Sequence, residues 1–479
     1  MKELNKNTVK HYKQNPVKIV QFGEGNFLRA FIDWIFDNLN ESENFNGSVT
    51  IIQPIEQGLT DIINHQNGLY HVFIKGLVNN EVVEDIRLIK SVNKCINPYI
   101  DYADYEQLAT QESIEYIISN TTEAGIEYVD EKLIPNEIAK SYPGKLTQFL
   151  YKRFQHFNGD KNKGLTILPC ELINNNADEL KKCIYKYIDV WNLGTDFKQW
   201  IEKATSFHNT LVDRIVTGYP KDNIQEYQEK IGYKDNLIVT AEHYHLWVIE
   251  GKNDNKLNQL FKNSNLNVLL VDKLQPYRTR KVRILNGAHT SMVPVGLLNG
   301  NTTVQQTVEQ TFTKDFVQSV IFNEICPILD FPEKEITEYA NEIINRFKNP
   351  AIAHQLSSIA LNSISKFKVR VLPSIIDYYN KFNKLPVNLS FAFAALIVFY
   401  KGNGMPVNDD KETINIFTNL WEKHNINNLV KKVLENKAFW DKDLNSIDGL
   451  AEAMSKAVGL IEDKGVEKAW KEFCKYNNH

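Results

Sequence analysis

The chain has 479 residues, which is enough for two or three domains with sizeable cores. Its composition, 43% hydrophobic and 24% charged residues, is that of a globular protein, and a net charge of −4 predicts neither a nucleic-acid-binding surface nor a polybasic membrane patch. The five cysteines are widely spaced, which argues against a disulfide framework and against a cysteine-rich zinc site.

Targeting segments are not evident in the sequence. The N-terminal stretch MKELNKNTVKHYKQNP is polar and lacks the apolar segment of a signal peptide. No uninterrupted apolar run approaches the ~20 residues that a transmembrane helix needs. We therefore expect a cytoplasmic protein.

Strands and helices alternate through the first half of the chain. We expect strands at 17–22, 48–53, 114–119 and 164–169, strand-rich sequence at 236–250, and a helix at 26–39. Residues 70–75 and 82–90 also alternate as strands do, and an Asn79-Asn80 turn between them predicts a β-hairpin. This alternation favours a parallel sheet, in which ligands bind beyond the carboxyl ends of the strands. Residues 23–26, 121–123 and 171–176 fall on that side.

The second half of the chain is dominated by helical patterns. We expect helices at 304–328, 333–347, 351–366, 389–401, 410–424 and 450–471. The predicted fold class is thus α/β, with a Rossmann-like doubly wound sheet and a β-hairpin excursion in residues 1–275. A mainly α-helical domain, expected to bind the substrate, follows in residues 276–479.

The stretch VKIVQFGEGNFLRA places a G-x-G turn between a strand and a helix. Gly23 would make the tight turn, Gly25 would let the backbone approach a pyrophosphate, and Asn26 would cap the helix. The third glycine of G-x-G-x-x-G is replaced by Leu28, so a plain strand–turn–helix connection remains an alternative.

The cofactor is expected to be NAD. The second strand is followed by one late acidic candidate, Glu56, and by no arginine that would receive the 2′-phosphate of NADP.

A second constellation is RKVRILNGAHT, at the predicted border between the domains, where clefts tend to form. On a helix, Asn286 and His289 share a face, whereas Lys281 is offset from Asn286 by roughly 140°. All three would converge if the helix began near Lys281. Beside two cationic neighbours, Arg280 and Arg283, the lysine would have a lowered pKa and could act as a general acid. The alternative is a solvated basic helix start with a capping asparagine.

Together these segments resemble the polyol-specific long-chain dehydrogenase/reductase family, over nearly the whole chain. The family motif K-x₄-N-x₂-H is present as Lys281, Asn286 and His289. The family's first element, G-x-G-x-F-x-R-A, has no third glycine, which accounts for Leu28. Further matches are the T-E-x-G turn at 122–125, the segments CELINNNA and VDRI, the strand WVIE, and SIALNSISK, in which Ser358 stands where the family has arginine.

The resemblance implies reversible, metal-independent hydride transfer with NAD and a small sugar or sugar-acid substrate. The sequence is closest to family members that reduce tagaturonate, while members that reduce fructuronate or oxidise mannitol share the catalytic set and are the alternatives. The implied catalytic residues are Lys281, Asn286, Asn176 and His289, with both asparagines binding the alkoxide. The implied cofactor residues are Phe22, Gly23, Glu24, Gly25, Asn26, Phe27, Thr121, Thr122 and Glu123. The substrate residues are Asp213, which the resemblance implies, and Lys366, Arg278, Arg280 and Arg283, which are all candidates for the substrate carboxylate.

Two other functions compete with this interpretation. His243 and His245 form an H-x-H pair that would put both rings on one face of a strand and could hold zinc. The second competing function is that of a non-catalytic NAD-binding protein with the same fold, although the intact lysine and asparagines argue against it.

Overall fold

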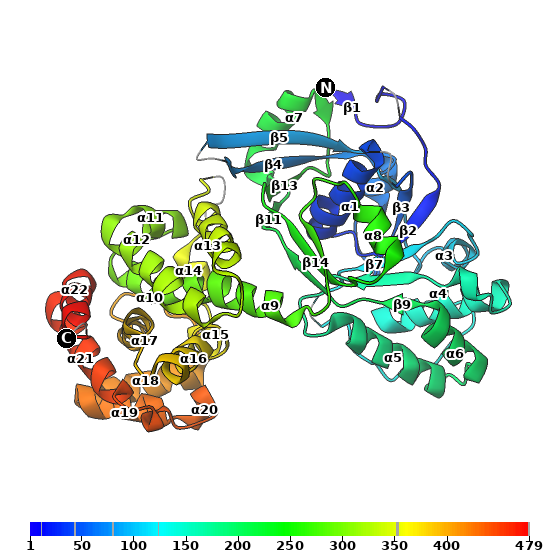
Figure 1. The fold of residues 1–479 in the computed structure, drawn as a ribbon. Coiled ribbons are helices and arrows are strands. Elements are labelled where there is room, and N and C mark those ends of the chain that lie inside the picture. The colour runs from blue at the N-terminus through cyan, green and yellow to red at the C-terminus, as the bar shows by residue number, and fades with distance from the viewer. Residues whose placement is uncertain (11, 43–44, 79–80, 123, 351–353, 478–479) are drawn as a thin grey trace. The chain divides into compact units, whose positions relative to one another are not determined.

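The computed structural model describes residues 1–479 except 11, 43–44, 79–80, 123, 351–353 and 478–479. The chain forms two compact units, an N-terminal unit, Met1–Leu274, and a C-terminal unit, Gln275–His479 (Figure 1). Among the described residues, every named strand lies in the N-terminal unit, and the C-terminal unit is built from helices. The predicted α/β-then-helical architecture is therefore confirmed.

The main sheet of the N-terminal unit is parallel throughout and has the order β6-β3-β2-β7-β8-β9. Its strands are β2 (Val17–Phe22), β3 (Ser48–Ile52), β6 (Val92–Ile96), β7 (Tyr116–Ser119), β8 (Thr166–Pro169) and β9 (Ser206–Phe207). The chain starts at the centre, runs outward through β3 and β6, and then returns to β7 on the other side of β2. This reversal is the topological switch point at which doubly wound sheets bind ligands.

Both faces of this sheet are buried because neighbouring residues of each strand enter different cores. In β7, Ile117 packs into one hydrophobic cluster and Ile118 into the other, and Ile167 and Leu168 of β8 divide in the same way. Two-sided burial explains why these strands are continuous apolar runs. The helices of this unit are α1 (Asn26–Glu41), α2 (Thr60–His65), α3 (Tyr102–Leu108), α4 (Tyr142–His156), α5 (Asn176–Val190), α6 (Thr195–Ala204), α7 (Ile224–Ile231) and α8 (Asn255–Phe261), with short 3₁₀ turns η1 (Lys161–Lys163) and η2 (Lys221–Asn223).

The predicted hairpin is part of a second sheet. Strands β4 (Tyr70–Val78) and β5 (Glu81–Ile89) pair antiparallel, and their connecting residues 79–80 lie outside the described residues. The hairpin joins β13 (Val239–Glu242) and β11 (Val216–Gly218) in the order β11-β13-β4-β5, so it is more than a local excursion.

The strand-rich segment 236–250 is divided between two sheets. Its first strand, β13, pairs with the hairpin, whereas β14 (Leu246–Glu250) lies between β10 (Thr210–Asp213) and β15 (Val268–Val271). Near the N-terminus, β1 (Lys2–Glu3) pairs with β12 (Tyr233–Lys234).

The core of the C-terminal unit surrounds α17 (Val387–Phe399), which is buried from Asn388 to Phe399. A helix that is apolar on all sides needs partners all round, and α17 packs against α10 (Gly287–Leu298), α21 (Leu450–Lys464) and α22 (Val466–Asn477). The other helices are α9 (Gln275–Lys281), α11 (Val304–Glu309), α12 (Thr311–Gln318), α13 (Glu333–Phe347), α14 (Leu356–Ile359), α15 (Ser363–Arg370), α16 (Leu372–Phe382), α18 (Lys411–Lys423), α19 (Ile426–Glu435) and α20 (Lys437–Trp440). Two π-helical turns, η3 (Val282–Asn286) and η4 (Ser319–Ile325), and two 3₁₀ turns, η5 (Cys326–Ile328) and η6 (Leu444–Ser446), complete the unit.

Three predicted long helices are interrupted. The helix expected at 351–366 begins outside the described residues and is broken after α14, where Asn362 has a left-handed φ of 52°. Gly465, with φ of 75°, separates α21 from α22. The helix expected at 304–328 breaks at Gln310, whose ψ of 129° is extended. Within the described residues, no helix combines the length and apolarity that crossing a membrane requires.

Candidate functional site

The glycine turn follows β2 at the switch point of the main sheet. Gly23 has a φ of +119°, and its N–H donates to Ile52 O at 3.0 Å. A Cβ on Gly23 would lie 2.9 Å from Asn120 O, in the turn after β7. Glycine is therefore required at position 23 for both its conformation and the space around it.

Gly25 differs from Gly23 in both conformation and surroundings. It is the N-cap of α1, so Asn26, which the sequence suggested as the cap, is the first helical residue. A Cβ on Gly25 would project into open space, α1 has no side-chain cap, and its first turn holds no acidic residue. These features leave backbone N–H groups and the positive end of the helix dipole for an anion, and they fit the pyrophosphate of a dinucleotide.

Arg29 and Leu28 explain how the turn is held without a third glycine. The Leu28 side chain packs over Gly23, with Cδ1 3.2 Å from the position of a Gly23 Cβ. The buried Arg29 donates from Nε to Glu24 O at 3.0 Å and from Nη2 to Asn26 Oδ1 at 2.7 Å. Its Nη1 donates to Leu237 O at 2.5 Å, which anchors the turn to the chain preceding β13.

The ends of β7 and β8 are joined by a buried carboxylate. Glu171 accepts hydrogen bonds from Ser119 Oγ and from both the N–H and the hydroxyl of Thr121. Burial raises the pKa of Glu171, although these hydrogen bonds oppose the rise. Thr122 has a φ of 90°, which is unusual for a β-branched residue and marks stored strain of a kind that concentrates at functional sites. Glu123 lies outside the described residues.

The position that usually recognises the adenosine ribose, at the end of β3, is occupied by Gln53. Its amide is saturated within the following loop, donating to Ile55 O and Glu56 O and accepting from the N–H and hydroxyl of Thr60. The Glu24 carboxylate lies beside it, since Glu24 Oε1 is 2.3 Å from the position of a Gly58 Cβ. Burial raises the pKa of Glu24, while the N–H groups of Glu24 and Leu59 favour its ionised form.

Asn176 does not have the environment that an oxyanion role requires. Its side chain is fully buried at the start of α5, and Nδ2 donates to the carbonyls of Pro169, Glu171 and Thr210. Its Oδ1 accepts from the N–H groups of Ala177 and Thr210. With every donor engaged, Asn176 ties β8, α5 and β10 together, and the structure does not support its expected contact with an alkoxide.

Asp213 lies in one of the smaller sheets, and the histidine pair lies between two of their strands. Asp213 is buried at the end of β10. His243 and His245 are in the turn between β13 and β14, so they are not on one strand as the zinc hypothesis required. His245 Nε2 accepts from Asn267 N at 2.9 Å, and burial beside Arg214 lowers the pKa of His245 to about 4. Within the described part of the chain, no group of three or more His, Cys, Asp or Glu residues is arranged to hold a metal ion.

Lys281, Asn286 and His289 lie on one continuous helical segment that begins at Gln275, not at Lys281. Between Lys281 and Asn286 the helix widens into the π turn η3, in which Gly287 N–H donates to Val282 O. Residues five apart are one turn apart in a π-helix, whereas in an α-helix they diverge by roughly 140°. The π turn therefore brings Lys281 onto the face of Asn286. The half-buried Asn286 amide makes no side-chain hydrogen bond with the described residues.

The two arginines beside Lys281 have partners inside the C-terminal unit. Arg280 Nη1 lies 2.7 Å from Glu335 Oε1 on α13. Arg283 donates to Ser374 Oγ and to Asp377 Oδ2 on α16, both at 2.9 Å. They are therefore not unpaired cationic neighbours of Lys281, and both guanidinium groups are engaged within the C-terminal unit.

His289 and Lys366 complete the predicted set. The His289 ring is buried and packs against Phe347, with centroids 4.3 Å apart, and against His354. Lys366 on α15 is half-buried, and its Nζ donates to Ile359 O at 2.9 Å. Burial lowers the pKa of Lys366.

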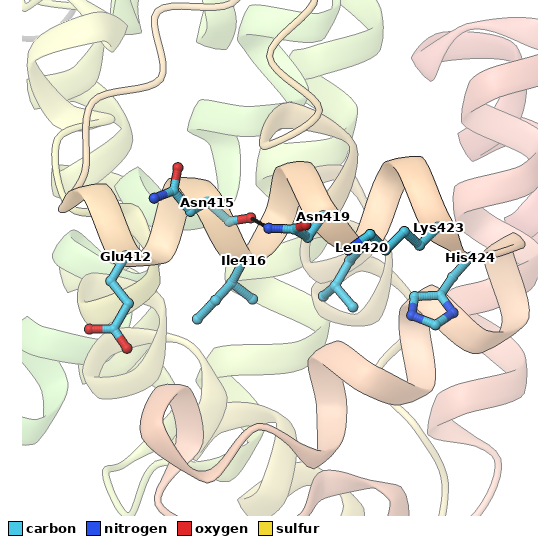
Figure 2. Close-up of a pocket in the computed structure, with 7 residues that line it drawn as sticks. All are labelled: Glu412, Asn415, Ile416, Asn419, Leu420, Lys423 and His424. Carbon is cyan, nitrogen blue, oxygen red and sulfur yellow. Dashed lines mark hydrogen bonds between the residues drawn. The ribbon is translucent and has the colours of Figure 1, made fainter.

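A separate hollow of about 470 Å³ lies on the outer face of α18 (Figure 2). The helix α18 and the residue that follows it supply the lining, which consists of Glu412, Asn415, Ile416, Asn419, Leu420, Lys423 and His424. None of the predicted site residues contributes to it, and a hollow on a single helix is too open to enclose a reaction. We assign it no catalytic role.

Sequence reasoning missed the residues that hold the site. Glu335 and Asp377 are 55 and 94 residues from their arginine partners, and Leu237 is 208 residues from Arg29. No local pattern marks such contacts. The only signal available was the unusual density of arginines around Lys281.

A parallel sheet with a G-x-G turn at its switch point, followed by a helical unit carrying Lys281 and Asn286, defines a Rossmann-type oxidoreductase. The model of the mannitol dehydrogenase Rossmann domain matches residues 17–262, and that of the mannitol dehydrogenase C-terminal domain matches residues 273–461. The chain therefore belongs to the mannitol dehydrogenase family, which confirms the resemblance drawn from the motifs.

Relatives named altronate oxidoreductase align along almost the entire chain. The altronate oxidoreductase of Bacillus subtilis (strain 168) is 44% identical over 99% of this chain and 98% of its own length. That of Bacteroides thetaiotaomicron is 43% identical over 97% of this chain and 98% of its own length.

Solved structures share the fold at low identity. A substrate-free D-sorbitol dehydrogenase has a TM-score of 0.80 at 18% identity, with 98% of this chain and 99% of that chain covered. The mannitol 2-dehydrogenase of Pseudomonas fluorescens, in a ternary complex with NAD and D-mannitol, has a TM-score of 0.69 at 19% identity, with 99% of both chains covered.

Proposed function

We propose that the chain catalyses the reversible, NAD-dependent reduction of D-tagaturonate to D-altronate, a step in hexuronate catabolism. The observation that supports the chemistry is the π turn, in which the residues Lys281 and Asn286 are one turn apart on one helix. The substrate assignment is supported by relatives named altronate oxidoreductase, which are 43–44% identical over nearly the whole chain.

The N-terminal unit supplies the cofactor site in this proposal. Bound NADH supplies the hydride that reduces the substrate carbonyl. The backbone of the glycine turn would bind the pyrophosphate, and the other contacts would come from Phe22, Gly23, Glu24, Gly25, Asn26, Phe27, Thr121, Thr122 and Glu123. The Glu24 carboxyl lies beside the saturated Gln53, and residues 53–60 after β3 contain no arginine that would receive a 2′-phosphate, which favours NAD over NADP.

The C-terminal unit supplies the proton and stabilises the alkoxide. Lys281 Nζ would donate its proton to the carbonyl oxygen during reduction and accept it back during oxidation. The Asn286 amide would donate a hydrogen bond to the same oxygen as negative charge develops on it. His289 would orient a neighbouring substrate hydroxyl.

The substrate carboxylate needs a cationic partner. Arg280 and Arg283 are paired with Glu335 and Asp377. We therefore assign this role to Lys366, which is half-buried and whose Nζ donates to Ile359 O, and Arg278 is the alternative. Asp213 would bind substrate hydroxyl groups.

A panel of reductions tests the proposal. Purified protein is assayed with NADH or NADPH and with D-tagaturonate, D-fructuronate or D-fructose, and kcat/KM is compared. We expect the highest value with tagaturonate and NADH. A clear preference for fructose or for fructuronate would replace the substrate assignment, and a preference for NADPH would replace the cofactor assignment.

A further inference from the structure

The π turn η3 has no local cause. Its sequence, VRILN, contains neither proline nor glycine, and π-helical turns are rare because the α-helical hydrogen bonds are usually preferred. Val282 and Ile284 are β-branched, but β-branching does not cause a helix to widen. A π turn holds more residues than an α-helical turn. This widened turn must therefore be stabilised by contacts with other elements of the C-terminal unit.

Two arginines provide such contacts, one before the π turn and one inside it. Arg280, in the last turn of α9, is only 4% exposed and is ion-paired with Glu335 on α13. Its guanidinium carbon lies 5.0, 4.8 and 4.2 Å from three ring centroids, those of Tyr277, Phe331 and Tyr339. This packing fixes the rotation of α9 about its axis.

Arg283 fixes the turn itself. It reaches α16 with two hydrogen bonds, from Nη1 to Ser374 Oγ and from Nη2 to Asp377 Oδ2. A forked guanidinium that engages two acceptors holds an orientation better than a single point charge does. The helix is thus attached to α13 just before the extra residue and to α16 within it.

A third contact holds the far side of the turn. A Cβ on Gly287, the residue that closes the π hydrogen bond, would lie 3.0 Å from Arg370 O at the end of α15. The absence of a side chain at Gly287 lets η3 approach α15 closely.

We propose that Arg280 and Arg283 are positioning residues, which stabilise the π turn and thereby align Lys281 with Asn286. The inference rests on the proposed function, because it requires that Lys281 and Asn286 act on the same substrate oxygen. This positioning role replaces the binding of the substrate carboxylate, which the positive charge of the two arginines suggested. The two roles differ in their consequences: a carboxylate ligand governs substrate affinity, whereas a positioning residue governs the chemical step.

The test compares each partner of the Arg283–Asp377 pair. Arg283→Gln, Asp377→Asn and the double variant are assayed for kcat, KM for tagaturonate, NADH affinity by fluorescence titration, and hydrogen exchange of residues 282–290. We expect each single variant to lose about 10-fold or more in kcat with KM changed by less than about twofold, since misalignment costs rate more than binding. The double variant should lose no more than either single variant, because both remove one contact.

Hydrogen exchange in 282–290 should be faster in all three variants, and NADH affinity should be unchanged. Glu435→Gln, which removes an exposed ion pair with Lys432 on α19, is the matched control and should leave every measurement unchanged. Arg283→Lys, which keeps the charge but loses the fork, should behave like Arg283→Gln and covers the case in which Gln prevents folding.

Two results would overturn the inference. In the first, Arg283→Gln raises KM strongly at constant kcat while Asp377→Asn changes neither, which would identify Arg283 as a substrate ligand. In the second, exchange in 282–290 and kcat both remain at the wild-type level in the variants. If the wild type itself reduces no tagaturonate, the proposed function fails instead, and unchanged exchange in the variants would still reject the stabilising role of Arg283.

Discussion

Asn176 and Asn286 carry the same side chain in opposite environments. The Asn176 amide is fully buried and engages five backbone groups around the ends of β8 and β10. Asn286, at the end of the π turn, is half-buried, and its amide makes no hydrogen bond with the described residues. The fold engages one amide fully, and we propose a catalytic role only for the other.

Alanine variants should separate these two roles. Asn176→Ala should lower the free energy of unfolding by about 2–4 kcal/mol, because buried backbone groups lose their partners. Asn286→Ala should keep wild-type stability and reduce kcat by about 10²- to 10³-fold, as expected for removal of one alkoxide donor. Urea denaturation and steady-state kinetics measure the two effects. A stable Asn176→Ala protein with a comparable loss of kcat would restore the oxyanion role to Asn176.

The two glycines of the turn predict another pair of outcomes. Gly23→Ala should destabilise the fold by about 1–3 kcal/mol, because φ is +119° and the new Cβ would meet Asn120 O. Gly25→Val should fold normally, since φ is −63° and the Cβ would enter open space, but should weaken NADH binding by about 10-fold or more. Thermal unfolding and fluorescence titration distinguish them. Wild-type affinity in Gly25→Val would show that the pyrophosphate lies elsewhere.

At the scale of elements, the C-terminal unit contains a buried acid that caps its central helix. Glu324, in the π turn η4, accepts from Asn388 N, Asn388 Nδ2 and Leu389 N at the start of α17. A carboxylate suits the N-terminus of a helix, where backbone N–H groups and the dipole favour negative charge. The effect of burial is nevertheless larger than that of these hydrogen bonds, and it raises the pKa of Glu324 from 4.5 to about 7.

This shift predicts a pH dependence of stability. Because the folded pKa lies above the unfolded value, the native state holds the proton more tightly, and its stabilisation is complete below pH 4.5 and lost as pH rises through about 7. Relative to Glu324→Gln, which cannot titrate, the wild type should lose on the order of 2–3 kcal/mol of unfolding free energy between about pH 5 and pH 8.

Urea titrations of both proteins at several pH values measure that difference. The variant is the necessary reference, since buried Asp33 in the N-terminal unit also has a pKa raised to about 7 by burial and contributes to the total. Parallel pH profiles for wild type and variant would show that Glu324 is ionised in the fold throughout this range.

At the scale of the whole molecule, the cofactor and proton functions are assigned to different units. The glycine turn and Glu171 belong to Met1–Leu274, whereas Lys281, Asn286 and His289 belong to Gln275–His479. Each unit is compact by itself, so a change in one set of side chains should leave the other set intact.

Lys281→Ala tests this division. We expect wild-type NADH affinity, because the dinucleotide contacts lie in the N-terminal unit, and a loss of about 10²- to 10⁴-fold in kcat, because the proton donor is gone. Lys273→Ala, an exposed lysine eight residues earlier, is the control and should be fully active. Substantial residual turnover in Lys281→Ala would reject Lys281 as the acid/base.

Much of the architecture could be predicted from the pattern of residues that are neighbours in the sequence. Apolar runs at 17–22, 48–53, 114–119 and 164–169 predicted the parallel strands, because strands buried on both faces are continuously apolar. The fold class and the family were likewise predicted from the sequence and are confirmed. The interruptions of helices at Gln310 and Asn362 were not predicted. Neither residue type excludes a helix, and the surrounding packing decides where each helix ends.

The sequence by itself determined the fold class, the glycine turn and the identity of the Lys281, Asn286 and His289 motif, because these depend on spacing and residue type along the chain. The tertiary structure alone decided what the individual side chains do. It engaged Asn176 with backbone groups, paired Arg280 and Arg283 with Glu335 and Asp377, and widened the helix at η3. Partners 55 to 208 residues away supply these effects, and a hydrogen bond or ion pair over such a separation leaves no periodicity in the sequence.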